Sequence, residues 1–173
     1  MKTAIILASS REQGNTHQLA HLYMEHQTCD LFNLSDYAIS AFDYQHRNKN
    51  DDFKVLIKTL ITYDRLIFAT PVYWYAMSAQ MKVFVDRLSD LLTIEKTLGR
   101  ALKGKSCSLL ATGEDNEAPE CFIAPFNLLA NYLGINFTSS FYCCCRKNFI
   151  KQEHVNDLKK YLAIEFANIK SLK

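Results

Sequence analysis

Short apolar runs alternate along this chain with longer segments whose apolar residues recur at helical spacing, and this alternation restricts the fold more than any other feature. Strands that alternate with helices form parallel sheets, because each helix carries the chain back across a face of the sheet. The expected strands cover residues 3–8, 29–33, 65–70, 107–112 and 136–145. The expected helices cover residues 15–26, 52–63, 78–92, 117–133 and 151–170.

A parallel sheet of this kind is covered by helices on both faces, and right-handed crossovers favour the strand order 2-1-3-4-5. We therefore expect an α/β fold, a flavodoxin-like three-layer sandwich with a five-stranded parallel sheet in that order. The 173 residues suit a single domain, residues 1–173. Ligands of such sheets bind beyond the carboxyl ends of the strands, so the loops after the first, third and fourth strands are expected to form the site.

The segments between and within these elements carry further expectations. Residues 34–51 are expected to form a long polar loop, and residues 96–105 a basic connector. The third helix should turn its apolar residues from Met81 to Leu92 toward the core. Pro125 is expected to kink the fourth helix or delay its start, because proline has no backbone N–H to donate.

Charge is nearly balanced in this chain, with 20 basic and 18 acidic residues and a formal net charge of +2. That balance gives no electrostatic case for binding nucleic acid or a membrane surface. No apolar run approaches the roughly 20 residues that span a bilayer. The apolar start of the chain is too short for a signal peptide, so a soluble cytoplasmic protein is expected.

The loop after the first strand has the residue types of a phosphate site. Ser9 and Thr16 supply hydroxyl groups, and Arg11 supplies a permanent charge with donors that match phosphate. The first N–H groups of a helix that begins at Asn15 would add further donors. Gly14 is the only glycine of this loop, so the loop is neither a Walker loop nor a dinucleotide fingerprint. The simpler alternative is a helix cap with no ligand.

The loops after the third and fourth strands add aromatic and glycine residues to the same edge. Tyr73, Trp74 and Tyr75 are adjacent in a segment that should be exposed. They could pack against a partner subunit or a neighbouring loop, or flank a flat aromatic ligand. Gly113 allows the backbone to approach a ligand closely. The three loops together fit a phosphorylated, flat aromatic cofactor, and flavin mononucleotide (FMN) matches that description.

The six cysteines have a separate interpretation, since three of them are consecutive. Without an export signal, disulfides are not expected. Cys143 and Cys145 share one face of the fifth strand and Cys144 the other. Small buried strand residues are the preferred explanation over a zinc or iron–sulfur site.

The loop motifs resemble those of the NAD(P)H-dependent FMN reductases, a family of flavodoxin-like flavoproteins that includes NAD(P)H:quinone oxidoreductases. The motif Ser9-x-Arg11-x-x-Gly14-Asn15-Thr16 resembles the phosphate loop of that family. Residues 70–82, followed by Phe84-x-Asp86-Arg87, resemble its second flavin loop, and residues 111–113 the third. The chain departs from the family at Ala8, where glycine is usual, and it lacks the cluster cysteines of the iron–sulfur members near Trp74.

The resemblance implies a homodimeric FMN enzyme that passes hydride from NADPH or NADH through bound FMN to a small acceptor such as a quinone or free flavin. It implies no catalytic side chain and no metal. The implied cofactor-binding residues are Ser9, Arg11, Gly14, Asn15, Thr16, Pro71, Val72, Tyr73, Trp74, Thr112, Gly113 and Glu114. Asp86 and Arg87 are adjacent, so they point to different sides of their helix and are expected to be positioning groups.

Two alternatives remain beside the reductase. The first is a flavodoxin-type electron carrier, but such carriers are strongly acidic and have a shorter phosphate loop without arginine. The second is a flavin-binding redox sensor in which residues 143–145 respond.

Overall fold

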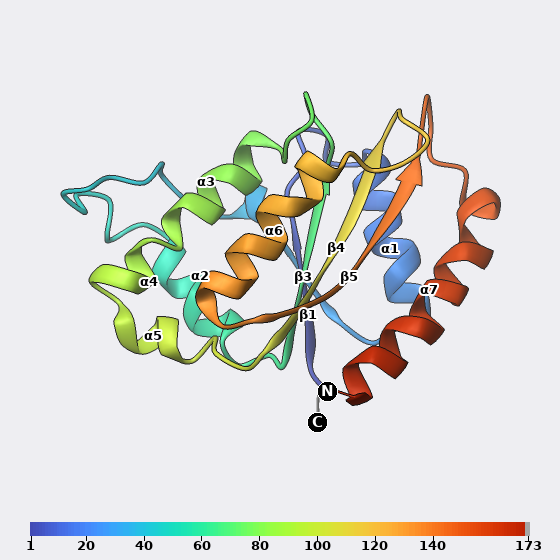
Figure 1. The fold of residues 1–173 in the computed structure, drawn as a ribbon. Coiled ribbons are helices and arrows are strands. Elements are labelled where there is room, and N and C mark those ends of the chain that lie inside the picture. Colours follow the sequence, from blue (N-terminus) through green and yellow to red (C-terminus); the bar gives the residue numbers. More distant parts are fainter. Residues whose placement is uncertain (172–173) are drawn as a thin grey trace.

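The computed structural model describes residues 1–171 and confirms the expected fold class. Its sheet has five parallel strands in the order β2-β1-β3-β4-β5, with helices on both faces (Figure 1). The strands are β1 (Thr3–Leu7), β2 (Asp30–Asn33), β3 (Arg65–Pro71), β4 (Ser106–Gly113) and β5 (Asn136–Cys144).

Seven α-helices and one short 3-10 helix connect or follow these strands in the described residues. The α-helices are α1 (Asn15–His26), α2 (Phe53–Leu60), α3 (Ala79–Arg87), α4 (Asp90–Thr93), α5 (Lys96–Arg100), α6 (Glu120–Leu133) and α7 (Lys151–Ser171), and the 3-10 helix is η1 (Leu34–Asp36). Among the described residues, no helix combines the length and the apolar character that crossing a membrane requires.

Alternation along the buried strands produces one apolar core on each face of the sheet. In β1, Ala4 and Ile6 pack toward α2, α3 and α6, whereas Ile5 and Leu7 pack toward α1 and α7. Every residue of β1 and β3 is buried. Strands that are buried on both faces have nearly continuous apolar sequences, and for this reason β1 and β3 could be predicted from the sequence.

The expectation of one continuous helix over residues 78–92 is wrong, because the helix breaks between the end of α3 at Arg87 and the start of α4 at Asp90. After α3 the chain turns through backbone hydrogen bonds of the i to i−3 type, from the N–H groups of Leu88 and Ser89 to the carbonyls of Val85 and Asp86. The tighter turn changes the direction of the following residues. Leu92, expected to face the core, is therefore 42% exposed.

Two further expectations need correction. The basic connector over residues 96–105 contains a helix, α5. The fourth helix begins at Glu120 rather than at residue 117, and Pro119 occupies its N-cap position. Pro125 lies inside this helix, and the Cys121 carbonyl that it cannot bond belongs to an exposed residue, where water can solvate it. The ends of the other expected elements differ by at most three residues.

Buried arginines attach outer segments to this core. Arg65 of β3 pairs with Glu165 of α7, and both side chains are inaccessible to solvent. Arg87 of α3 pairs with Asp51 of the long loop and with Asp90 of α4. Asp86 instead pairs with Lys82 at the surface, so the two adjacent residues do point to different sides of the helix.

Candidate functional site

A pocket of about 990 Å³ lies at the carboxyl ends of β1, β3 and β4. This volume is at the upper end of the range for small-molecule sites, roughly 300–1,000 Å³. The loops that follow β3, β4 and β5 project from the same edge of the sheet (Figure 1). All the residues implied as cofactor-binding by the resemblance line this pocket, from Ser9 in the first loop to Glu114 after β4. The structure therefore brings the three loops together as one cavity.

The start of α1 faces this pocket with unpaired backbone donors. Gly14 is its N-cap, and no side chain caps the helix. The first helical hydrogen bond runs from the Gln18 N–H to the Gly14 carbonyl. The N–H groups of residues 15–17 consequently have no partner among the described residues. An uncapped helix start of this kind favours an anion.

Two glycines permit close packing around the pocket. A Cβ atom on Gly14 would lie 2.9 Å from the Cβ atom of Arg11, so glycine lets the loop fold tightly under that side chain. A Cβ atom on Gly113 would lie 2.7 Å from Tyr142 Oη and 3.2 Å from Val72 Cβ. Glycine at this position therefore allows β4 to approach both the aromatic loop and β5.

A pair of buried hydroxyl groups joins the first loop to the end of β4. The Oγ1 atoms of Thr16 and Thr112 lie 2.7 Å apart, and both residues line the pocket. Two hydroxyls that share one hydrogen bond retain one O–H group between them. That donor is available to a ligand in the pocket.

Asn15 uses its side chain to hold another loop. Its Nδ2 atom donates to the Lys147 carbonyl at 3.1 Å, and its Oδ1 atom accepts from the Phe149 N–H at 3.1 Å. Both ends of the amide are thus engaged with the segment after β5. The contribution of Asn15 to an anion site is its backbone N–H.

The aromatic loop forms a tight hairpin at the rim of the pocket. Tyr73 and Ala76 exchange two backbone hydrogen bonds of 2.9 and 3.0 Å. Between them, Trp74 and Tyr75 have φ angles of 49° and 63°. A two-residue hairpin turn with positive φ at both central positions normally uses asparagine and glycine, so two aromatic residues here store backbone strain.

The same hairpin displays its aromatic rings to solvent. Trp74 is 94% exposed and Tyr75 is 62% exposed. The base of the loop is fixed, because the Ser78 hydroxyl accepts from the Met81 N–H at 3.3 Å and lies 3.0 Å from the Ala8 carbonyl, to which it donates. Strained, exposed aromatic rings on a fixed base are typical of a segment that contacts a ligand or another molecule.

Further lining residues lie outside the implied cofactor-binding set. Tyr75 was expected only as one of three aromatic residues that could flank a ligand, and Asp115 and residues 145–148, which follow β5, were missed. The adjacent cations Arg146 and Lys147 could have revealed the last group, because a fifth parallel strand ends at the same edge as the others. The fifth strand lies beside the fourth, and its loop returns toward the start of α1.

The consecutive cysteines alternate as their strand predicts. Cys143 and Cys145 are buried, and Cys144 is half-buried. Burial, with smaller effects from Cys144 and Glu153, raises the pKa of Cys145 to about 11. This thiol is protonated at neutral pH, and thiols are reactive as thiolates. The environment of Cys145 thus gives little support to a redox sensor.

Comparison with known proteins relates this geometry to a family. The sequence model of the NADPH-dependent FMN reductases matches residues 1–146. The Bacillus subtilis protein YwqN, named as an NAD(P)H-dependent FMN-containing oxidoreductase, is 30% identical in an alignment 147 positions long that covers 79% of this chain and 81% of YwqN.

Solved structures resemble the whole fold. The structure described as the Trp repressor binding protein from Bacillus subtilis has a TM-score of 0.68 at 22% identity, and covers 96% of this chain and 97% of its own. General stress protein 14 from Treponema denticola, solved in complex with FMN, has a TM-score of 0.67 at 21% identity. The match covers 97% of this chain and 99% of the chain of that structure. At these identities, the likeness establishes the fold.

Proposed function

Since this chain belongs to the NADPH-dependent FMN reductase family, we propose that it binds FMN in the pocket at the sheet edge and uses NADPH or NADH to reduce a small acceptor such as a quinone or free flavin. The observation that carries the proposal is the joint arrangement of the pocket. One end has Arg11 and an uncapped helix start, and the other has a strained aromatic hairpin.

The phosphate of FMN fits the end formed by the first loop. Arg11 supplies a charge-assisted donor, and Ser9 and Thr16 supply hydroxyl groups. Gly14 gives the loop its tight turn. The unpaired N–H group of Asn15 would donate to the anion, which would lie at the positive end of the α1 dipole.

The ring system fits between the loops after β3 and β4. Pro71, Val72, Tyr73 and Trp74 would form one wall, and Thr112, Gly113 and Glu114 the other. Val72 N–H donates to the Thr112 carbonyl at 2.8 Å, which holds the two walls at a fixed separation. A flat ligand is favoured by walls that are tied together at their base.

When bound, FMN would supply the redox chemistry, accepting hydride from the nicotinamide and passing it on to the acceptor. The chain binds and orients the reacting groups, and no side chain needs to serve as acid or base. The exposed rings of the hairpin would cover a ligand at the rim and limit water there.

The proposed function is tested by adding FMN to the purified protein and then NADPH or NADH without air. We expect the protein to bind FMN, the nicotinamide to bleach the flavin absorbance, and a quinone to restore it. A protein that binds no FMN would contradict the proposal. Bound flavin that neither nicotinamide reduces would instead favour the electron carrier.

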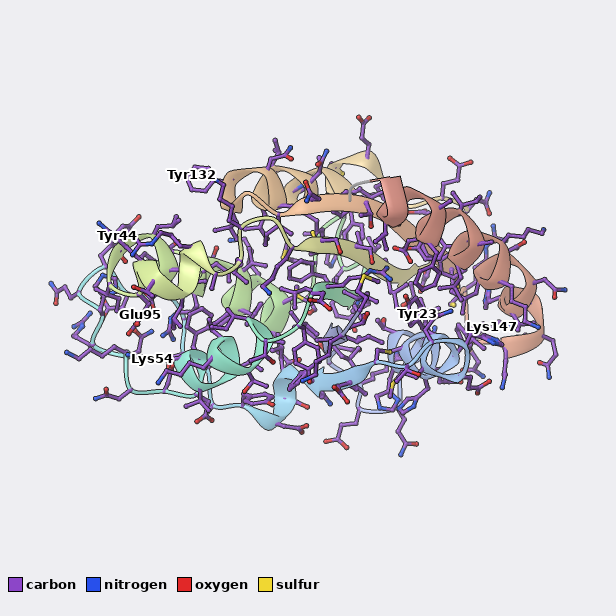
Figure 2. All side chains as sticks on the ribbon, turned by 90° about the horizontal axis from the view of Figure 1, so that it is seen from below. Tyr23, Tyr44, Lys54, Glu95, Tyr132 and Lys147 are labelled. Carbon is purple, nitrogen blue, oxygen red and sulfur yellow. The ribbon has the colours of Figure 1, made fainter. Side chains whose placement is uncertain are left out.

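A homodimer is part of the proposal, with the contact on the face formed by α6 and the neighbouring α3–α4 segment. Leu128 and Tyr132 are 67% and 75% exposed there, and Leu92 is 42% exposed. Tyr132 projects outward from α6 (Figure 2). The Cys121 thiol at the start of α6 lies 3.9 Å from the Tyr75 carbonyl, so this apolar face continues into the exposed hairpin beside the pocket.

Replacing both Leu128 and Tyr132 with aspartate is expected to turn the dimer into a monomer, because two carboxylates would be buried in an apolar contact. Light scattering measures the mass directly. The control is Val55→Asp, at a residue that is 63% exposed on α2. A double variant with the same mass as the wild type would place the interface elsewhere.

Two further statements complete the proposal. Residues 1–173 act as one domain, which is supported by the two cores on opposite faces of a single sheet. The protein works in the cytoplasm, which is supported by a family activity that consumes reduced nicotinamide.

A further inference from the structure

The segment after β5, residues 145–148, forms a fourth wall of the pocket and carries two cations that the FMN reductase motifs do not include. We call it the basic segment. Arg146 and Lys147 both line the cavity. The remaining charges of the lining are Arg11 on the first loop and the carboxylates of Glu114 and Asp115 after β4.

The basic segment is attached to the pocket on both sides. On one side, the Cys145 N–H donates to the Gly113 carbonyl at 2.6 Å, and Arg146 Nη2 donates to Asn116 Oδ1 at 2.9 Å. On the other side, the Asn15 amide bonds the Lys147 carbonyl and the Phe149 N–H. These contacts fix its backbone across the loop after β4 and the start of α1.

The two cations therefore differ in their surroundings. The Arg146 guanidinium is bonded to Asn116, a residue of the loop after β4 that does not line the pocket. Lys147 is bonded through its carbonyl to the first residue of α1, the helix whose N–H groups are unpaired. Figure 2 shows Lys147 on the side of the molecule that carries α1. Lys147 Nζ makes no ion pair with any residue that the structure describes.

We propose that Lys147 is, together with Arg11, a second cation for the phosphate of FMN, and that Asn15 is the positioning residue that holds the Lys147 backbone at the start of α1. The inference rests on the proposed function, since it concerns the same cofactor. An uncapped helix start, Arg11 and Lys147 together supply positive charge for a dianion. The consequence is a preference for FMN over riboflavin, which has the same ring but no phosphate.

The test is a titration of flavin-free protein with FMN and, separately, with riboflavin, followed by the quenching of flavin fluorescence. Lys147→Met is expected to weaken FMN binding about tenfold, the loss typical of one charge-assisted hydrogen bond, and to leave riboflavin binding unchanged. Lys147→Arg should restore most of the FMN affinity, because it restores the charge. Lys159→Met, at an exposed lysine on α7 outside the pocket, is the matched control.

The positioning role of Asn15 is tested with a double-mutant cycle. Asn15→Ala should weaken FMN binding, and combining it with Lys147→Met should add little, because both changes remove the same contact. Full additivity of the two losses would overturn the positioning role. An equal effect of Lys147→Met on FMN and riboflavin would overturn the phosphate contact, because a change of pocket shape affects both ligands.

The outcomes separate this inference from the proposed function. If Arg11→Ala weakens FMN binding and Lys147→Met does not, the proposal that Lys147 contacts the phosphate is wrong, and the proposed FMN site is still supported. If the wild-type protein binds neither flavin, the proposed function fails and this inference fails with it.

Discussion

Replacing Glu165 with alanine is expected to lower the free energy of unfolding by about 3–5 kcal/mol, the range for breaking a buried ion pair by removing one partner. The partner left behind is Arg65, whose side chain is inaccessible to solvent. An unpaired cation in that position has no water to replace the lost carboxylate, and this accounts for the size of the effect.

The contacts of the pair explain why it is sensitive to single changes. Glu165 Oε1 accepts from Ser139 Oγ at 2.7 Å and from the Tyr161 hydroxyl at 2.5 Å. Arg65 donates to the Tyr23 hydroxyl at 2.9 Å and to Ser108 Oγ at 2.8 Å. Burial, and then the charge of Glu165, raises the pKa of Tyr161, so this phenol is a neutral donor at physiological pH.

Urea denaturation at pH 7 measures the loss. The double variant Arg65→Met with Glu165→Leu should recover much of it, because an apolar pair removes both buried charges. Among the described residues, the Arg65 Nε and Glu165 Oε2 atoms have no hydrogen-bond partner, so removing both charges also removes two buried polar atoms that are not paired there. Asp157→Ala removes the exposed ion pair with Lys160 on the same helix and should cost less than about 1 kcal/mol. If Glu165→Ala lowered the free energy of unfolding by no more than Asp157→Ala does, the prediction would be wrong.

The second large effect is expected at Arg87, where substitution by methionine should also cost about 3–5 kcal/mol. The Arg87 guanidinium pairs with Asp51, bonds Asp90 through Nε at 3.0 Å, and donates to the Ser40 carbonyl at 3.1 Å. It also lies 4.7 Å from the centre of the Phe53 ring. Its loss would remove the guanidinium from Asp51 and Asp90, leaving Asp90 with only the His46 ring, whose Nδ1 lies 2.9 Å from Asp90 Oδ1, and would release the long loop from α3.

The effect of Arg87→Met should depend on pH. Burial raises the pKa of Asp51, but the hydrogen bond from Arg87 and the bonds from the Ser40 and Phe53 N–H groups outweigh it, so the pKa of Asp51 lies below its ordinary value. A carboxyl with a lowered folded-state pKa contributes stability above its unfolded pKa, and this is lost as the pH falls through the folded value. The difference in free energy of unfolding between the wild type and Arg87→Met should therefore reach its maximum at pH 7 and shrink below about pH 4.

Thermal or urea unfolding at pH 7 and pH 3 measures this difference. Lys82→Ala is the control on the same helix, since it removes the exposed pair with Asp86 and should have little effect at either pH. A difference that stays constant across the two pH values would show that lost packing, rather than the ion pairs, causes the destabilisation.

Local patterns in the sequence were sufficient for much of the fold. The expected bounds of α1, Asn15–His26, are those observed, because its apolar residues have a clear helical period. The break after α3 was missed because apolar residues continue at helical spacing as far as Leu92. Contacts between distant segments, such as Arg87 with Asp51, accompany that break and leave no local signal.

The candidate site shows the same division. The sequence identified residues of three loops that the sheet places around one cavity, since parallel strands end at a common edge. It did not identify the basic segment, because Arg146 and Lys147 look like ordinary surface residues in the sequence. Only the structure shows that the Asn15 side chain bonds the Lys147 carbonyl and the Phe149 N–H, which ties this backbone to the start of α1. The sequence placed Asn15 among the residues that hold the phosphate, and the structure engages both ends of the Asn15 side-chain amide with the loop after β5, which leaves the backbone N–H for that role.

The sequence by itself determined the order of strands and helices, the parallel sheet and the three loops that meet at its edge. These follow from apolar periodicity and from the direction of parallel strands, both of which are local or topological. Tertiary structure alone decided which buried charges pair, where helices break and how Lys147 reaches the start of α1. The physical reason is that such contacts join residues more than 30 positions apart, and their geometry exists only once the layers have packed.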